Sequence, residues 1–373
     1  MDRRTADAYE RGAATWIARR GPSGIADGRL AAFLQRLPRT GWVADLGCGP
    51  GWYAAAISRS GRRVVALDVS AAMLAAVRRH APGAARVRAD LAALPFARHA
   101  LAGAWALNCY AHVPRRQLAL ALADLHAALC PGAPVALTLA DLDALPRAAQ
   151  RARLGTRDEV EHRFTGDAMG SRLFTAMTRA RARALLIGAG FTGVRTEAVA
   201  DAFWIHLTAR RARTLPDLVR PGLRLLICGL NPSVYSADAG VPFARPGNRF
   251  WAAAGAAGLV TRARDPRAAL RRGIGFTDLV KRATPGAAAL SAREYAAGVE
   301  RVAALVRLYR PKAICFVGLD GWRAAVDRRA QPGWIPDGFA GADAYLMPST
   351  SGRNAATPPA ELAAHLRRAA AGR

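Results

Sequence analysis

The sequence predicts two successive α/β domains, each with a parallel sheet covered by helices. Three observations lead to this prediction. A chain of 373 residues is too long for one typical domain and comfortable for two. Short apolar runs alternate with alanine-rich helical patterns over the first two hundred residues, and this alternation restarts near residue 223. Between these stretches, residues 209–221 (ARRARTLPDLVRP) are basic and bracketed by prolines, which favours a boundary and domains over 1–210 and 215–373.

Each domain contains apolar runs of strand length separated by longer helical patterns. In the first domain we expect strands at residues 42–46, 63–68, 101–107 and 134–139, with helices at 70–79 and 116–129. In the second we expect strands at residues 223–228, 273–279, 313–317 and 344–347, with helices at 249–258, 291–309, 321–329 and 359–370. This order favours parallel strands joined by right-handed crossovers.

The charge balance is strongly basic. The hydrophobic fraction of 52% and the charged fraction of 22% are ordinary for a globular protein, whereas the net charge of +27 is not. Lys281 and Lys312 are the only lysines, so arginine supplies nearly all of the positive charge, a bias that partly resembles GC-rich codon usage. A field of this sign still attracts polyanions, and nucleic acid is therefore a candidate partner.

The cysteines and the N-terminal residues narrow the class of protein. Five widely separated cysteines form no CxxC or Cys/His pair, so the sequence predicts neither a disulfide framework nor a metal site. The first residues lack a basic-then-apolar signal, and no apolar run is long enough to span a bilayer. We expect a reduced, cytoplasmic protein with no membrane contact.

A glycine-rich turn follows the first predicted strand. It reads DLGCGPG over residues 45–51, and the glycines at 47, 49 and 51 let the backbone turn tightly and approach a ligand. The helix that begins next offers its amide ends to that ligand. The second strand ends at Asp68, whose carboxylate can accept two ribose hydroxyls. Asp90 and Leu91 follow the third strand position, where a carboxylate can accept an adenine amino hydrogen.

These motifs resemble those of the class I S-adenosylmethionine-dependent methyltransferases, which have a Rossmann-like fold. The resemblance covers about residues 1–210 and implies S-adenosylmethionine as the cofactor. It implies that Asp45, Gly47, Gly49 and Gly51 surround the amino-acid end of the cofactor, Asp68 the ribose, and Asp90 with Leu91 the adenine. A nicotinamide cofactor is the less favoured alternative, because the turn is not GxGxxG and no arginine answers a second phosphate.

The methyl acceptor leaves little trace in the sequence. LNCYAHVP at residues 107–114 follows the fourth strand, where this family places catalytic or acceptor groups. His112 is a candidate base or a residue of the helix entry, and Tyr9 either covers the cofactor or packs in the core. Asn108 lacks the Pro-Pro-Tyr/Phe that follows in enzymes that methylate amino groups of nucleic acids. Because methyl transfer needs little beyond proximity and in-line geometry, the acceptor stays undefined.

A second motif begins where the first strand of the second domain ends, at the sheet edge where α/β proteins bind ligands. Pro232 fixes its own backbone and holds Asn231 out of a helical conformation, so the amide is presented on a stiff turn. An amide cannot take a proton at neutral pH, but its oxygen can orient a water. Such a group suffices for hydrolysis of an N-glycosidic bond to uracil, because the departing base spreads its charge over two carbonyls.

The segments that follow suit a pocket for an extruded base. Phe243 offers a flat face to a pyrimidine, and Asn248 offers an amide to read its edge. Near the C-terminus, MPSTSGR at residues 347–353 follows a strand, and its small residues can hold phosphates with backbone amides. Arg353 can enter the gap that an extruded nucleotide leaves, a step that costs least at a mismatch.

GLNPS, GVPFARPGNRFW, GIGFTDLVKRAT and MPSTSGR, in this order, resemble motifs of the mismatch-specific uracil/thymine DNA glycosylases of the uracil-DNA glycosylase superfamily. The resemblance runs from about Leu215 to the C-terminus and implies a three-layer α/β/α fold with a short parallel sheet. It implies double-stranded DNA with a G·U or G·T mismatch as substrate, and neither metal nor cofactor. It implies Asn231 as the residue that positions water, Phe243, Gly229 and Asn248 as base-binding residues, and Ser349, Ser351, Gly352 and Arg353 as DNA-binding residues.

Two departures from that family bear on specificity and rate. Ser233 replaces a glycine of the usual GINPG, and Val241-Pro242 replace a His-His pair before the stacking aromatic. Loss of those polar groups predicts altered base selectivity, which favours uracil over thymine. The amide of Asn231, in place of a carboxylate, predicts slow chemistry. No lysine lies in the catalytic motif, so we expect base removal without strand cleavage.

Purely structural interpretations of the same residues are also open. The Asn231-Pro232 pair is also compatible with a plain turn, Phe243 with a core residue, and Arg353 with one more surface arginine. Lys281 and Arg282 are expected to be solvated or to face phosphate. For the whole chain, one alternative is a non-catalytic mismatch binder that recruits the methyltransferase. Another makes methyl transfer the main activity, on a small molecule or nucleic acid, with the second domain as a targeting module.

Overall fold

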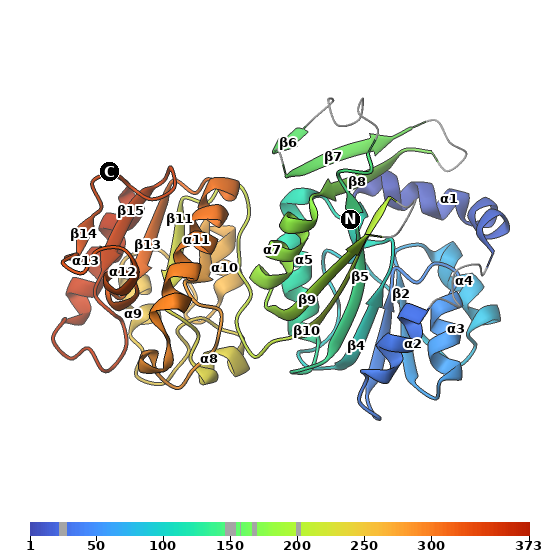
Figure 1. Cartoon of the computed structure of the whole chain (residues 1–373), viewed down its shortest axis with the longest axis horizontal. Helices are drawn as coiled ribbons and strands as arrows, with labels where there is room; N and C mark the ends of the chain where they lie inside the picture. The colour runs from blue at the N-terminus through green and yellow to red at the C-terminus, as the bar shows by residue number, and fades with distance from the viewer. Residues whose placement is uncertain (22–27, 146–153, 157, 166–169, 199–202) are drawn as a thin grey trace. The chain divides into compact units, whose positions relative to one another are not determined.

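The structure is a computed structural model that describes residues 1–21, 28–145, 154–156, 158–165, 170–198 and 203–373 (Figure 1). Its internal contacts divide the chain into two compact units. The first comprises residues 1–187 and 191–212, and the second comprises residues 188–190 and 213–373. Each unit contains its own sheet with helices packed against it, which confirms the predicted α/β class.

The first unit is built on a sheet whose strands follow the order β3-β2-β1-β4-β5-β8-β7-β6, with β10 between β5 and β9. Strands β1 to β5 pair in parallel, as the sequence predicts. The bounds are β1 (Trp42–Leu46), β2 (Arg63–Asp68), β3 (Ala85–Arg88), β4 (Leu101–Ala106), β5 (Pro134–Asp141), β6 (Leu154–Thr156), β7 (Glu159–Phe164), β8 (Arg172–Met177), β9 (Phe191–Ala198) and β10 (Trp204–Arg211).

The sequence predicts parallel strands throughout the first sheet, but one side of this sheet contains antiparallel strands. Strand β7 runs antiparallel to β6 and β8, and β10 runs antiparallel to β5 and β9. Strands β7 and β10 mix buried with partly exposed residues and carry several charged side chains, whereas β4 and β5 are buried throughout, so the apolar signal of β7 and β10 is weak. They matter for the site because β8 adds side chains from residues 172–177 to the edge where β1 and β4 end.

Helices cover this sheet and begin at residues that suit helix starts. In α4, the Ser70 hydroxyl accepts a hydrogen bond from the Met73 amide at 3.1 Å, an N-cap that the sequence expectation had counted as helix. Pro114 precedes α5 and holds its entry extended. The bounds are α1 (Arg3–Arg20), α2 (Gly28–Gln35), α3 (Trp52–Arg59), α4 (Ala71–His80), η1 (Tyr110–His112), α5 (Arg115–Ala128) and α7 (Arg179–Gly188).

The second unit holds a smaller sheet of order β12-β11-β13-β15-β14, parallel except for the short edge strand β14. Every residue of β11, β12 and β13 is buried, as in a sheet covered on both faces. The bounds are β11 (Leu225–Gly229), β12 (Ile274–Asp278), β13 (Ala313–Val317), β14 (Gly333–Trp334), β15 (Asp343–Met347), α8 (Val234–Ala239), α9 (Phe250–Ala256), α10 (Pro266–Arg271), η2 (Ala287–Ala289), α11 (Ala292–Tyr309), α12 (Asp320–Ala325) and α13 (Pro359–Ala371).

Two segments of the second unit have structure that the sequence did not indicate. Residues 214–219 are mostly buried, and Leu218 pairs with Phe276 of β12, so the boundary segment is part of a packed domain. The stretch after Asn231 contains the helix α8, whose N-cap is Ser233. The Ser233 hydroxyl accepts a hydrogen bond from the Ser236 amide at 3.0 Å, which gives this departure from the family motif a structural purpose.

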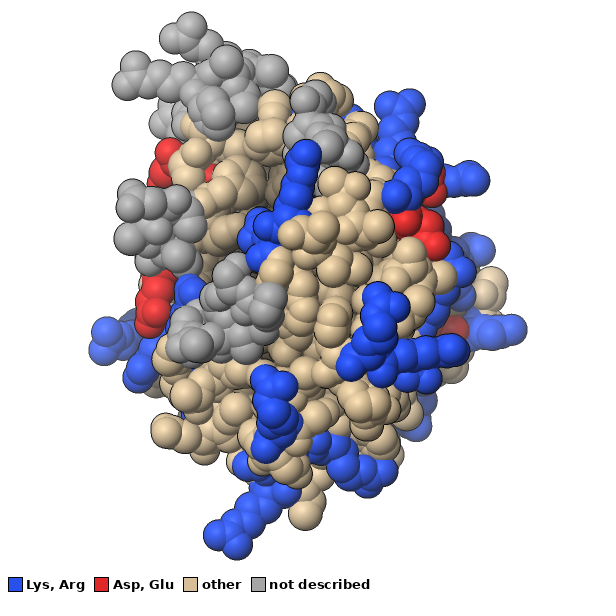
Figure 2. Space-filling view, turned by 90° about the vertical axis from the view of Figure 1, so that its right-hand side faces the viewer, with Lys and Arg blue, Asp and Glu red and all other residues tan. Residues whose placement is uncertain are grey.

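The positive charge is dispersed on the part of the surface that Figure 2 shows. Basic side chains are scattered over this face of the first unit, and the few carboxylates lie toward its edges. A dispersed field attracts polyanions without defining a footprint for them. Among the described helices, none combines the length and the apolar character that a membrane crossing requires.

Candidate functional site

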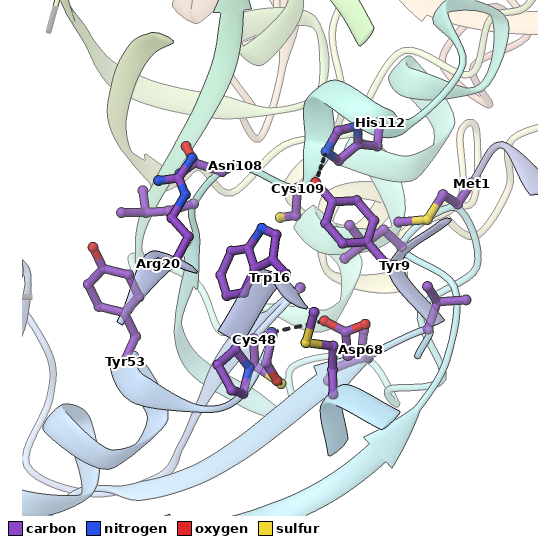
Figure 3. Close-up of a pocket in the computed structure, with 18 of the residues that line it drawn as sticks. Met1, Tyr9, Trp16, Arg20, Cys48, Tyr53, Asp68, Asn108, Cys109 and His112 are labelled. Carbon is purple, nitrogen blue, oxygen red and sulfur yellow. Dashed lines mark hydrogen bonds between the residues drawn. The ribbon is translucent and has the colours of Figure 1, made fainter. Parts of the chain in front are cut away.

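The first candidate site is a cavity beside the glycine-rich turn that links β1 to α3 (Figure 3). Gly47 and Gly49 line it with φ angles of 63° and 53°, in the left-handed region that glycine adopts without strain. A Cβ at Gly47 would lie 2.3 Å from the Cβ of Cys109, so only glycine fits there. Gly51 instead caps α3 and packs against Val77, away from the cavity wall.

Asp68, the last residue of β2, is fixed at the cavity by two backbone amides. The Gly49 amide donates to Oδ2 and the Ser70 amide donates to Oδ1, both at 2.9 Å (Figure 3). Burial raises the pKa of Asp68 to about 6, against the effect of these hydrogen bonds. Asp68, which the sequence predicts as a ligand-binding residue, thus lines the cavity, and these contacts orient its carboxylate.

Two other predicted acidic residues do not reach the cavity wall. Asp45 is buried beneath the turn, where burial raises its pKa to about 7, and its Oδ2 has no hydrogen-bond partner among the described residues. The carboxylate of Asp90 pairs with the amino group of Met1. Met1 and Leu91 line the cavity while Asp90 does not. Asp45 and Asp90 therefore do not line the cavity, and their predicted roles remain predictions.

Tyr9 of α1 and His112 of η1 meet at the same cavity (Figure 3). The tyrosine hydroxyl lies 3.0 Å from Nε2, and Nδ1 lies 2.7 Å from the carbonyl of Leu173. A carbonyl only accepts, so Nδ1 carries the proton and Nε2 accepts from Tyr9. Burial lowers the pKa of His112 to about 4, so the ring is neutral at pH 7 and a weak base. In this arrangement the histidine ring accepts a hydrogen bond that holds the tyrosine hydroxyl in place.

Several aromatic rings and two arginines also line the wall, and sequence reasoning missed them. Trp16 and Arg20 come from α1, Arg172 and Phe174 from β8, and Trp204 from β10. Figure 3 shows the guanidinium of Arg20 extending toward Asn108, with Trp16 beside it. No motif could have indicated these residues, because α1 and β8 are distant in sequence and are brought together by the fold.

The second candidate site is a cavity in the second unit, and it collects most of the residues predicted from separate motifs. Its wall includes Asn231, Phe243, Asn248, Ser349, Ser351 and Arg353. Gly229 and Gly352 lie behind this wall. A Cβ on Gly352 would come within 2.9 Å of the Gly247 carbonyl, so this glycine allows the two loops to approach each other.

Asn231 follows β11, and hydrogen bonds donated by its side-chain nitrogen hold the amide in place. Nδ2 donates to the Arg282 carbonyl at 2.9 Å and to the Thr284 hydroxyl at 2.8 Å. Because the donor end of the amide is occupied, the oxygen is the end left to accept a hydrogen bond. A fixed acceptor at a cavity wall can orient a water molecule.

Phe243 presents its ring from a strained backbone. Its φ of 57° is rare for a bulky residue and is a common feature of binding sites. The ring stacks on Phe250, with centroids 4.2 Å apart and an interplanar angle of 19°. The side chain is half-buried and lines the cavity, so it differs from Phe250, which is buried in the core.

The remaining predicted residues shape the loops around the cavity. The Asn248 oxygen accepts from the Phe250 amide at 2.9 Å, which holds that side chain near the start of α9. The Ser349 hydroxyl accepts from the Ser351 amide at 3.2 Å, so part of this hydroxyl's capacity is used within its own loop. The side chain of Arg353 is exposed at the rim, where an inserting group has to be.

One carboxylate in the second cavity was missed by sequence reasoning. Asp278 is the last residue of β12, is 7% exposed and lines the cavity with Asn231. Its signal lay in the motif GIGFTDLVKRAT, where a polar residue ends a fully buried strand parallel to that of Asn231. Lys281, which we expected in solvent or facing phosphate, instead pairs with the buried Asp217 at 2.9 Å.

Two protein-family models match the chain. Residues 43–132 match the family described as a methyltransferase domain, and residues 216–369 match the uracil DNA glycosylase superfamily. The chain therefore contains one domain of each kind. The first match spans the glycine turn, Asp68 and His112, and the second spans all four motifs of the glycosylase domain.

Solved methyltransferases are similar to part of the chain. A 1,6-didemethyltoxoflavin-N1-methyltransferase from Burkholderia thailandensis, with S-adenosylhomocysteine bound, is 20% identical; the match covers 55% of this chain and 84% of that one, with a TM-score of 0.41. A DhpI complex with SAM is 22% identical over 56% of this chain and 99% of that one, with a TM-score of 0.44. A methyltransferase from Methanosarcina mazei is 15% identical over 48% and 95%, with a TM-score of 0.41.

Proposed function

We propose that the glycosylase domain, over residues 215–373, hydrolyses the N-glycosidic bond of uracil in G·U mismatches of double-stranded DNA. The product is an abasic site in an uncut strand. We further propose that the methyltransferase domain, over residues 1–210, uses S-adenosylmethionine to methylate an acceptor that the sequence leaves undefined. The observation that carries the first proposal is the held amide of Asn231 beside the ring of Phe243 in one cavity.

This arrangement supports hydrolysis that is driven by departure of the base. A uracil rotated out of the duplex stacks on Phe243, whose other face is already supported by Phe250. The oxygen of Asn231 accepts a hydrogen bond from water and aims that water at C1′ of the sugar. As the glycosidic bond breaks, the base carries the electron pair into its two carbonyls, so a strong base is not needed to activate the water.

DNA contact is supported by residues at the rim of the same cavity. Arg353 is exposed there, and its guanidinium is the right size to fill the gap that the rotated nucleotide leaves. Backbone amides of residues 349–353 can bind phosphate oxygens beside it. Rotation of a base costs least where pairing is already weak, which supports preference for a mismatch.

The first cavity fits S-adenosylmethionine. The left-handed turn at Gly47 and Gly49 borders this cavity, and Asp68 lines it with a carboxylate that two backbone amides hold in place. In this assignment Gly47 and Gly49 border the amino-acid end, Asp68 the ribose and Leu91 the adenine. The cofactor supplies an activated methyl group when bound. Asp45, Gly51 and Asp90 then act indirectly, through the shape of the turn and of the third strand's end.

The residues that line this cavity favour an acceptor group that can lose its proton without a strong base. His112 is neutral and bonded to Tyr9, and burial raises the pKa of Tyr9, so neither takes a proton readily at pH 7. The domain's contribution is therefore to bind and orient the acceptor among the aromatic rings, with the nucleophilic atom in line with the methyl group.

The decisive experiment measures release of uracil from a labelled G·U duplex under single-turnover conditions. We expect the wild type to release uracil and Asn231→Ala to be at least ~100-fold slower, because the water is no longer positioned. Gln331→Ala, which removes an exposed amide elsewhere in the same domain, serves as the matched control and should keep the wild-type rate. Equal rates for the wild type and Asn231→Ala would remove Asn231 from the mechanism. Tight binding of the duplex with no base release would favour a non-catalytic mismatch binder.

A further inference from the structure

The methyltransferase cavity contains positive and donor side chains that the assignment of the cofactor leaves unused. Of the described residues that line it, Arg20 and Arg172 have positively charged side chains, and Asp68 is the one carboxylate. Asp68 is held beside the glycine turn by two backbone amides. In the view of Figure 3, Arg20 and Asn108 lie on the other side of Trp16 from Asp68. The part of the cavity around Arg20 therefore suits a negatively charged ligand.

Asn108 lines this cavity with an amide whose oxygen is already held. The buried Thr138 hydroxyl donates to Oδ1 at 3.0 Å and accepts from the backbone amide of Asn108 at 2.6 Å. Nδ2 is therefore the end of the side chain that can donate to a ligand. The φ of Asn108 is 58°, a left-handed conformation that is uncommon for a non-glycine residue and recurs at binding sites.

Tyr9 and His112, which line the same cavity, are committed to each other and to the backbone. Nδ1 of His112 donates to the carbonyl of Leu173, and Nε2 accepts from the Tyr9 hydroxyl. Burial raises the pKa of Tyr9, against the charge and the hydrogen bond of Arg172. Asp68 is assigned to the ribose. An acceptor atom that must first lose a proton would thus find no base at these residues, whereas an atom already ionised at pH 7 needs none.

Aromatic rings restrict the body of the ligand. The ring of Phe174 lies against His112, with centroids 4.5 Å apart, and Trp204 lies next to Phe174. On the side of α1, Trp16 stacks on Trp52 at a centroid distance of 5.5 Å and an interplanar angle of 20°. All of these rings line the cavity. Such surfaces bind planar or apolar molecules, so the negative charge belongs to one end of a ligand with an aromatic or apolar body.

We propose that the methyl acceptor is the oxyanion of a small organic acid with an aromatic or apolar body, held by Arg20 and Asn108, and that the product is its methyl ester. This proposal rests on the methyltransferase function proposed above. A guanidinium binds an oxyanion through two parallel hydrogen bonds, and Nδ2 of Asn108 adds a third donor. Lone pairs of the acid remain for the reaction, because an oxyanion has more acceptor positions than these donors occupy. Carboxylates and phosphonates share this chemistry.

The transfer balances without a base. A lone pair of the acid's oxygen forms the new bond to the methyl carbon. The bond between that carbon and the sulfur of S-adenosylmethionine breaks, and its electron pair stays on sulfur. No proton moves. The products are a methyl ester and S-adenosylhomocysteine.

The first test is calorimetry on the protein saturated with S-adenosylhomocysteine. Phenylacetate and phenylphosphonate are the acid probes, and phenylacetamide is the neutral counterpart of phenylacetate. We expect the wild type to bind at least one acid more than about tenfold more tightly than the amide, because hydrogen bonds between charged groups are the stronger ones.

Asn108→Asp is the sharpest variant. It keeps the shape of the side chain and an acceptor for Thr138, and aspartate tolerates the left-handed backbone, but it replaces the donor by a negative charge. We expect it to weaken binding of the acids more than tenfold and to leave phenylacetamide unaffected. Arg20→Gln should also remove most of the preference for acids. Arg19→Gln, at an exposed residue of α1 that does not line the cavity, is the matched control and should bind as the wild type does.

The second test follows label from methyl-labelled S-adenosylmethionine into each acid. Mild alkali releases methanol from a carboxylate ester but not from a phosphonate ester, which distinguishes the two kinds of acid. Absence of a preference for the acids in the wild type, wild-type affinity for the acids in Asn108→Asp, or binding of the acids with label transferred to neither would overturn the proposal. Failure of the wild type to bind S-adenosylhomocysteine would instead contradict the methyltransferase function itself.

Discussion

The two cavities lie at the same kind of place in their sheets but are built in opposite ways. Both border the carboxyl ends of parallel strands, next to a turn that leaves the first strand of the sheet. In the methyltransferase domain, the turn contains glycines at 47 and 49 with left-handed φ angles, a conformation that a side chain would strain. In the glycosylase domain, the turn is stiffened by Pro232, and Phe243 is held in a conformation that glycine would adopt more easily.

The buried carboxylates of the two cavities, Asp68 and Asp278, differ in how they are held. Asp68 receives hydrogen bonds from two backbone amides, so its orientation is set before any ligand binds. Asp278 is equally buried but has no such support among the described residues. A carboxylate held by the backbone suits a cofactor that binds in one pose. The two buried acids therefore differ in how far the described part of the chain orients them.

The substitution with the largest expected effect is at Gly47, in the methyltransferase cavity. Gly47→Ala places a Cβ 2.3 Å from that of Cys109 and requires a left-handed φ, so we expect S-adenosylmethionine affinity, measured by calorimetry, to fall more than about 100-fold. Uracil release should not change, because the other cavity is untouched. Gly61→Ala has a similar φ but open space around it, and we expect it to bind the cofactor normally. Normal cofactor binding by Gly47→Ala would show that the turn is not the cradle.

The corresponding substitution in the glycosylase cavity is at Phe243. Phe243→Ala removes the stacking surface, which is worth about 1–3 kcal/mol per base, so we expect uracil release at low substrate concentration to slow by roughly 5- to 150-fold. Cofactor binding by the methyltransferase domain should be unaffected. Tyr235→Ala removes an aromatic ring from α8 that is 48% exposed and does not line the cavity, and it should retain wild-type release. Equal losses in both variants would point to general damage of this segment.

A smaller effect is expected at the start of α1, the helix that brings Tyr9, Trp16 and Arg20 to the methyltransferase cavity. Asp2 caps this helix through the Thr5 amide at 3.0 Å and pairs with Arg163 at 2.9 Å. Burial opposes ionisation, but the hydrogen bonds from Arg163 and Thr5 lower the pKa of Asp2 to about 2. Asp2→Ala should therefore lower the Tm by about 2–4 °C at pH 7.

The pH dependence of that effect follows from the sign of the shift. A lowered folded-state pKa stabilises the protein above the unfolded value of 3.8, and this contribution is lost as the pH falls toward 2. The Tm difference between the wild type and Asp2→Ala should thus narrow in that range. Asp7→Ala, on the exposed side of the same helix, should change the Tm little at any pH. A constant difference down to pH 2 would show that charge is not involved.

Much of the fold could be predicted because its signals are local. The strands Trp42–Leu46, Arg63–Asp68 and Ala313–Val317 are found at the residues expected, since continuous apolar runs are typical of buried parallel strands. The antiparallel strands β7 and β10 were not expected, because their mixed composition does not separate them from loops. The helix α8 was also missed: it is short, and its capping residue Ser233 lies in a stretch that reads as a loop.

The candidate sites follow the same division. The glycine turn, Asp68, Asn231, Phe243 and Arg353 could be selected because each lies directly after a strand or in a motif next to one. Arg20 and Arg172 could not, since nothing in the sequence links α1 to β8. Asp45 and Asp90, which also lie at or after strand ends, do not line this cavity.

The sequence by itself determined the two α/β units, the positions of their ligand-binding turns and the chemical groups available at those turns, because strand ends and turn residues are encoded within a few neighbouring positions. Only the tertiary structure decided which groups face a cavity and in what protonation state. The neutral ring of His112, the held amide of Asn231 and the carboxyl group of Asp278 all depend on burial and on partners from distant segments. Solvent exclusion and long-range hydrogen bonds are properties of the packed chain, and no local pattern of residues records them.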